Sequence, residues 1–153
     1  MMRKHLAGIA RQSEGDELGD AIKDVLHVRI NMAVLLVIDD EFSVTEVLKA
    51  MLTDAGHEVV TAANGRQGLE RVNERPPDLV LVDVMMPVMG GPALLMAMHE
   101  DPILHQIPTI IMSSLPESTV AESTKGMYSA FLRKPFNGKA AVDVVNATLN
   151  QRG

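Results

Sequence analysis

The chain has 153 residues, of which 46% are hydrophobic, so it can form one domain with a sizeable core and a short appendage. Its formal net charge of −6 argues against a general nucleic-acid binder, and the absence of cysteine excludes disulfides and thiolate chemistry. No apolar run approaches the roughly 20 residues that cross a bilayer, and no secretory signal opens the chain, so we expect a cytoplasmic protein without a membrane partner.

Residues 1–32 differ in character from the rest of the chain, because they have a basic start and several interrupting glycines. We interpret them as a weakly ordered N-terminal arm, or as non-native residues if Met32 is the true start. The spacing of apolar residues from Asp16 to Arg29 is that of a short amphipathic helix, which leaves a docking or dimerisation role open. The domain itself is expected over residues 33–150, followed by a tail at 151–153.

Apolar runs alternate with segments of helical spacing along this domain. Strands are expected at 33–38, 58–62, 78–83, 108–112 and 129–132, and helices at 43–55, 66–74, 93–99, 117–125 and 139–149. Such alternation predicts parallel strands joined by helical crossovers. The fold class is therefore α/β, a flavodoxin-like (βα)5 three-layer sandwich with strand order 2-1-3-4-5.

Local signals support several of these elements. The unbroken run Leu79–Val82 predicts a strand that is buried on both faces. Asn137 is expected to cap the last helix, and Gly126 to end the helix before the fifth strand. His57 shows no ligand spacing and is expected on the surface, and the methionines are interpreted as flexible core filler.

Polar residues follow four of the five expected strands, at the edge of the sheet where open α/β folds carry their chemistry. They are Asp39 and Asp40, Asp83, Ser113, and Lys134. Carboxylates held close together repel one another unless a cation is present, and an all-oxygen site suits Mg²⁺, with Mn²⁺ as a second choice. Carboxylate, divalent ion, hydroxyl and ammonium together predict a phosphoryl-transfer site, although an acid after a strand is often only a turn former.

The motifs at these strand ends are Val37–Glu41, Val82–Pro87, Gly91, Ser113-Ser114 and Lys134–Phe136. In this order they resemble the receiver domain of two-component response regulators. The resemblance implies that Asp83 is the phosphoacceptor, that Asp40 binds Mg²⁺ directly, and that Asp39 helps to hold the ion. It further implies that Asp83 and the backbone carbonyl of Met85 are metal ligands, and that Lys134 contacts the phosphoryl group. Ser113 would be the hydroxyl switch and Phe131 the aromatic switch.

A stand-alone receiver would be a signalling switch, not an enzyme beyond its own phosphorylation and dephosphorylation. The resemblance implies a sensor histidine kinase or histidine phosphotransfer protein as the phosphoryl donor, and a downstream protein as the target. Direct DNA binding is not expected. The chain would be a monomer or a weak dimer through the fourth helix, fifth strand and fifth helix.

Two alternatives remain beside the switch. A Mg²⁺-dependent phosphatase with an aspartyl nucleophile also uses an α/β fold, but it usually carries Asp-x-Asp after the first strand and a substrate cap. A pseudo-receiver that only binds partners is disfavoured because every acceptor-site residue is present.

Within the receiver family, Gly90 replaces a common aspartate, Phe131 lacks a tyrosine hydroxyl, and Met85 and Leu115 are apolar where some relatives orient water. We expect from this a slowly hydrolysing aspartyl-phosphate.

Overall fold

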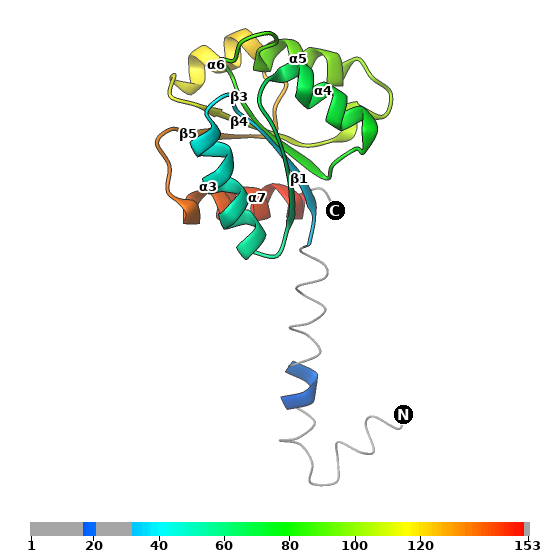
Figure 1. Ribbon diagram of the computed structural model, residues 1–153, viewed down its shortest axis with the longest axis vertical. Helices are drawn as coiled ribbons and strands as arrows, with labels where there is room; N and C mark the ends of the chain where they lie inside the picture. The colour runs from blue at the N-terminus through cyan, green and yellow to red at the C-terminus, as the bar shows by residue number, and fades with distance from the viewer. Residues whose placement is uncertain (1–16, 21–31, 152–153) are drawn as a thin grey trace. The chain divides into compact units, whose positions relative to one another are not determined.

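The computed structural model describes residues 17–20 and 32–151 (Figure 1). The chain divides into two units, residues 1–32 and residues 33–153. Residues 17–20 are helical, and Leu18 among them is exposed. The remainder of the predicted arm and of the predicted helix from Asp16 to Arg29 lies outside the described residues, as do residues 152–153 of the tail.

Five strands and five α-helices alternate through the second unit, together with one short 3-10 helix. In chain order they are β1 (Val34–Ile38), α3 (Phe42–Asp54), β2 (Glu58–Ala62), α4 (Gly65–Glu74), β3 (Leu79–Asp83), α5 (Gly91–His99), η1 (Leu104–Gln106), β4 (Thr109–Ser113), α6 (Glu117–Thr124), β5 (Ala130–Arg133) and α7 (Gly138–Gln151). Every predicted strand and helix is confirmed to within two residues at each end. The 3-10 helix lies between α5 and β4, where neither a helix nor a strand is predicted.

The strands form one sheet in the order β2-β1-β3-β4-β5, and all four neighbouring pairs are parallel. This confirms the predicted fold class. Because the strands are parallel and in register, their last residues lie along one edge: Ile38 pairs with Val82, Asp83 with Met112, and Ser113 with Arg133. The residues that follow the strands are thereby brought to the same edge of the sheet.

Helices cover both faces of the sheet (Figure 1). On one face, α3 and α7 pack Leu48, Leu52 and Val145 against the strands. On the other face, α4, α5 and α6 contribute the core residues Val72, Leu94 and Val120. The central strand β3 lies between the two cores, and its Leu79–Val82 run is fully buried, as the unbroken apolar pattern predicts.

Short polar signals define the helix ends. The side chain of Asn137 accepts a hydrogen bond from the Ala140 N–H at 2.7 Å, which confirms its predicted role as the cap of α7. Asn64 does the same for α4 by accepting from the Gln67 N–H at 2.9 Å. Helix α6 ends as predicted, because Lys125 and then Gly126 adopt positive φ angles of 53° and 69°. In the described part of the chain, no helix has the length and apolar character that a membrane span requires.

The expectation that His57 lies on the surface is wrong, because its side chain is buried with only 4% of the residue exposed. The Ala33 N–H donates to its Nδ1 at 3.1 Å, so the proton of the neutral ring is on Nε2. Nε2 then donates to the Asn146 Oδ1 at 3.0 Å. His57 therefore links the segment before β1 to α7, and both of its ring nitrogens are satisfied.

Candidate functional site

Three carboxylates meet at the carboxyl edge of the sheet. Asp39 and Asp40 directly follow β1, Asp83 is the last residue of β3, and one oxygen of each lies within 4.8 Å of the others. Asp39 and Asp83 are buried, whereas Asp40 is exposed at the mouth. We call these three residues the acidic cluster. Adjacent parallel strands bring these residues together as the sequence predicts.

Lys134, which follows β5, supplies the positive charge beside the acidic cluster. Its Nζ donates to the Asp39 Oδ2 at 2.6 Å and lies 3.5 Å from the Asp83 Oδ1. The other carboxylate oxygen of Asp39 accepts the Glu41 N–H at 2.9 Å. Both oxygens of the buried Asp39 are therefore engaged, and Lys134 is bonded more closely to Asp39 than to Asp83.

The electrostatics of the acidic cluster favour a cation. The pKa of Asp83 is raised from 3.8 to about 6, chiefly by burial and then by the charge of the neighbouring Asp39, while Lys134 acts in the opposite direction. Burial by itself would lower the pKa of Lys134, but its hydrogen bond to Asp39 and the charge of Asp83 raise the pKa above its usual value. Three ionised carboxylates and one ammonium leave two negative charges uncompensated. Close, hard oxygen ligands with excess negative charge fit a divalent ion such as Mg²⁺.

Ser113 ends β4, the strand that lies between Asp83 and Lys134. Its Oγ accepts a hydrogen bond from the Leu115 N–H at 3.0 Å, and the residue is buried. The hydroxyl therefore orders the turn that leads to α6, and its strand lies directly beside β3, which ends in Asp83. Phe131 of β5 pairs with Ile111, which lies two residues before Ser113 on the same face of β4. Its side chain packs against the core on the face of the sheet that α6 covers.

The loop between β3 and α5 borders the mouth of the site. Met85 is 69% exposed, so its interpretation as core filler is wrong for this methionine. At Gly91 a Cβ would stand 2.8 Å from the Asp83 carbonyl oxygen, so the loop can return this close to β3 only with glycine. The Gly91 N–H donates to the Val84 carbonyl at 2.9 Å and closes the loop.

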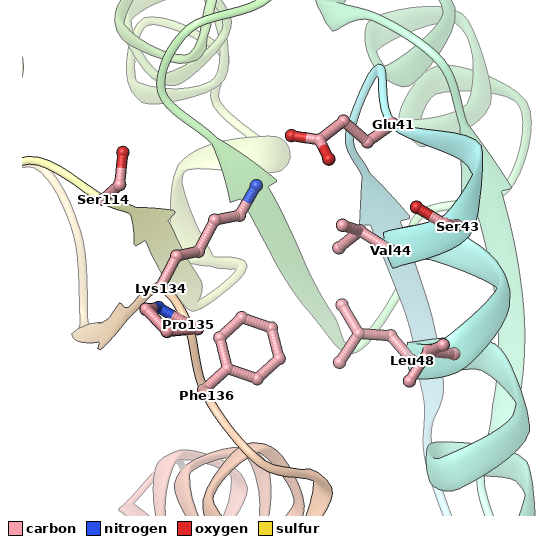
Figure 2. Close-up of a pocket in the computed structure, with 9 residues that line it drawn as sticks. Glu41, Ser43, Val44, Leu48, Ser114, Lys134, Pro135 and Phe136 are labelled. Carbon is pink, nitrogen blue, oxygen red and sulfur yellow. The ribbon is translucent and has the colours of Figure 1, made fainter.

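A groove of about 490 Å³ lies between α3 and the segment after β5, and the sequence did not indicate it. Its walls are Val44, Val47 and Leu48 of α3 and Pro135 and Phe136, with Glu41, Ser43, Ser114 and Lys134 as its polar lining. Figure 2 shows the Phe136 ring facing Val44 and Leu48 across the groove, with Lys134 above it. The groove thus joins an apolar wall directly to the charged edge of the site.

This arrangement matches the response regulator receiver domain, whose family model fits residues 35–146. The chain belongs to this family. The receiver is 34% identical to the chemotaxis protein CheY of Bacillus subtilis, and the match covers 76% of the chain and 97% of that protein. It is 32% identical to the protein PilH of Pseudomonas aeruginosa, with 77% and 98% of the two chains covered. The predicted family is thereby confirmed.

Solved structures agree with the fold. The Vibrio cholerae chemotaxis protein CheY4 superposes on the receiver with a TM-score of 0.72 at 29% identity, covering 76% of this chain and 98% of that one. The receiver also matches longer proteins, such as the probable transcriptional regulator ycf27 of Cyanophora paradoxa, with 34% identity. The chain spans about half the length of these regulators. Nothing in these likenesses favours the phosphatase alternative.

Proposed function

We propose that the receiver is a phosphorylation-controlled switch whose acceptor is Asp83. One observation carries the proposal: a buried carboxylate with a raised pKa lies within reach of two further acids and 3.5 Å from the Lys134 ammonium. Asp83 is buried although it is an acid, and burial destabilises its ionised form. Binding of a cation and then of a phosphoryl group would compensate the buried charge, and this explains why an acid stands at this position.

The acidic cluster would hold Mg²⁺ through Asp39, Asp40 and Asp83, with the backbone carbonyl of Met85 as a further ligand. When bound, the ion supplies charge neutralisation for the carboxylates and the incoming phosphoryl oxygens. A carboxylate oxygen of Asp83 attacks the phosphorus of a phosphohistidine, the P–N bond breaks, and the leaving imidazole is neutral after it takes up a proton from solvent. The product is an aspartyl-phosphate.

Lys134 must change partner during this reaction. In the unphosphorylated chain its Nζ is 0.9 Å closer to the Asp39 oxygen than to the Asp83 oxygen, from the distances of 2.6 and 3.5 Å. A phosphoryl group on Asp83 brings additional negative charge to that side, so the ammonium shifts toward it. Lys134 thereby stabilises the charge that develops during transfer and remains in the product.

The switch would pass from Asp83 to the surface of α6, β5 and α7 through Ser113 and Phe131. The Ser113 hydroxyl now accepts from the Leu115 N–H, but it can also donate to a phosphoryl oxygen. A move of Ser113 toward Asp83 pulls on the turn that leads to α6 and opens space for the neighbouring Phe131. Output through a protein partner, or through a weak dimer on this face, follows from that repacking.

The groove beside Lys134 supports a protein as the phosphoryl donor. A histidine kinase or histidine phosphotransfer protein must bring its phosphohistidine to Asp83 while its own surface docks nearby. The apolar walls formed by Val44, Leu48 and Phe136 offer a contact of this kind next to the charged edge. Val47 of α3 is a further wall residue of the groove and is exposed, so this apolar surface is accessible to a partner.

The test is to incubate the receiver with Mg²⁺ and phosphoramidate and to measure its intact mass. We expect an adduct of about 80 Da, the mass of one phosphoryl group, and its loss in Asp83→Asn. The absence of an adduct in the wild-type chain would overturn the proposal. Continuous release of phosphate from a generic phosphomonoester would instead favour a phosphatase, and that release is to be assayed on the same sample.

A further inference from the structure

The loop that follows the acceptor strand is held at two points. At its base, the Gly91 N–H donates to the Val84 carbonyl at 2.9 Å. At its tip, the Gly65 N–H, from the first residue of α4, donates to the Met89 carbonyl at 2.9 Å. Met85 lies between these two points. The position of its backbone therefore depends on both attachments.

The tip of this loop is strained. Val88 has a φ of 70°, and the Met89 N–H donates to the Pro87 carbonyl at 2.7 Å, which together define a γ-turn of the rare positive-φ kind. A β-branched residue is poorly suited to this backbone region. The Val88 side chain is 74% exposed, so its own packing gives little compensation. The conformation must therefore be held by contacts elsewhere in the loop.

Gly65 provides such a contact, and only glycine fits there. A Cβ at this position would overlap the Met89 carbonyl oxygen and stand 2.7 Å from its Cγ. The first overlap is with a backbone atom, so no rotation of a side chain could relieve it. The missing side chain lets the start of α4 approach the loop closely enough for the hydrogen bond, and the amino end of the helix favours a carbonyl oxygen at that place.

We propose that Gly65 is a positioning residue for the metal and acceptor site, because its N–H and its lack of a side chain hold the strained turn at Val88 and thereby the backbone of Met85. This inference rests on the proposed function, in which the Met85 carbonyl is a metal ligand. Only two residues separate Met85 from Val88, so a turn that relaxes to negative φ displaces the intervening backbone. Groups that orient a ligand commonly alter metal affinity by about 10-fold or more when they are removed.

The first comparison uses Gly65→Ala with Gly68→Ala as the matched control. Gly68 lies one turn later in α4, where a Cβ would overlap the Cδ1 of the buried Ile38, which is the end of a side chain and not a backbone atom. Binding of Mn²⁺ to each full-length chain is followed by the paramagnetic resonance signal of the free ion, with folding checked by circular dichroism. We expect Gly65→Ala to weaken Mn²⁺ binding about 10-fold, and Gly68→Ala to leave it within about twofold of the wild type.

The second comparison tests rescue. Val88→Gly removes the strain at the tip, because glycine adopts positive φ without penalty. In the Gly65→Ala background the Cβ still displaces the tip of the loop. Without strain to release, however, the turn at position 88 should keep its positive φ and the backbone of Met85 should stay near its place, which would restore most of the lost Mn²⁺ affinity. A general loss of folding caused by Gly65→Ala would not be reversed in this way, which makes the rescue specific to loop position.

Three results would overturn the role of Gly65: unchanged Mn²⁺ affinity in Gly65→Ala, equal weakening in Gly65→Ala and Gly68→Ala, or a double variant that binds no better than Gly65→Ala. The proposed function fails by a different result, namely the absence of a phosphoryl adduct on Asp83 in the wild-type chain. If Gly65→Ala does not fold, the single variant Val88→Gly is the test of the strained turn. Relief of the strain should raise the unfolding temperature without weakening Mn²⁺ binding. An unchanged or lower unfolding temperature, or weaker Mn²⁺ binding, would then overturn the proposal.

Discussion

The Asp83 carboxylate is predicted to destabilise the metal-free receiver, so Asp83→Asn should increase the free energy of unfolding. Burial raises the pKa of this carboxyl from 3.8 to about 6 in the folded chain. A group whose folded pKa is raised prefers its protonated form, so the ionised form that dominates at pH 7 is unfavourable for folding. The amide of asparagine is neutral and nearly the same shape as the carboxyl group, so Asp83→Asn removes the unfavourable free energy of the buried charge.

The magnitude follows from the two pKa values. A difference of about two pKa units corresponds to about 3 kcal/mol at a pH above both values. The effect is absent well below pH 3.8, grows as the pH rises, and is complete above about pH 6. We therefore expect Asp83→Asn to increase the free energy of unfolding by about 2–3 kcal/mol at pH 7 and by about a third of that at pH 4.5.

Urea unfolding followed by circular dichroism, with EDTA present, measures this gain at the two pH values. Asp40→Asn is the matched control, since it makes the same chemical change at the exposed member of the acidic cluster and should give a smaller gain. Added Mg²⁺ should stabilise the wild type and so reduce the difference in unfolding free energy between Asp83→Asn and the wild type. An equal or lower stability of Asp83→Asn at pH 7, or a stability gain that is the same at the two pH values, would show that the ionised Asp83 does not destabilise the fold.

Three further substitutions have expected outcomes. Lys134→Met should slow the appearance of the phosphoryl adduct about 100-fold in an intact-mass time course, and a rate near that of the wild type would exclude Lys134 from the reaction. His57→Phe should reduce the free energy of urea unfolding by about 1–3 kcal/mol, because the buried Ala33 N–H loses its acceptor; an unchanged midpoint would contradict this. Met85→Asn should shorten the half-life of the phosphorylated form by giving water a polar partner, and equal half-lives would show that Met85 does not protect the phosphoryl group.

The sequence was sufficient for the fold because its signals are local. Unbroken apolar runs such as Leu79–Val82 predict buried strands, and Asn137 and Gly126 mark helix ends where the structure has them. The strand order then brings the residues after parallel strands to one edge. The sequence alone therefore predicts that the acidic cluster, Ser113 and Lys134 lie together.

The errors concern contacts between residues that are far apart in the chain. His57 is buried by partners 24 and 89 residues away, Ala33 and Asn146, and no local pattern reports them. The clasp between Gly65 and Met89 also joins two elements, and the Asn64-Gly65 pair by itself indicates only a turn or the start of a helix. The groove needs the approach of Phe136 to α3, which again depends on tertiary packing.

Chemical trapping of the acyl phosphate would identify directly whether Asp83 carries the phosphoryl group. Borohydride reduces an aspartyl-phosphate to homoserine, which marks the modified position in a peptide mass spectrum. After reaction with Mg²⁺ and phosphoramidate, we expect homoserine at position 83, with Asp39 and Asp40 unchanged. Homoserine at position 39 or 40, or an acid-stable phosphate on Ser113, would contradict this expectation.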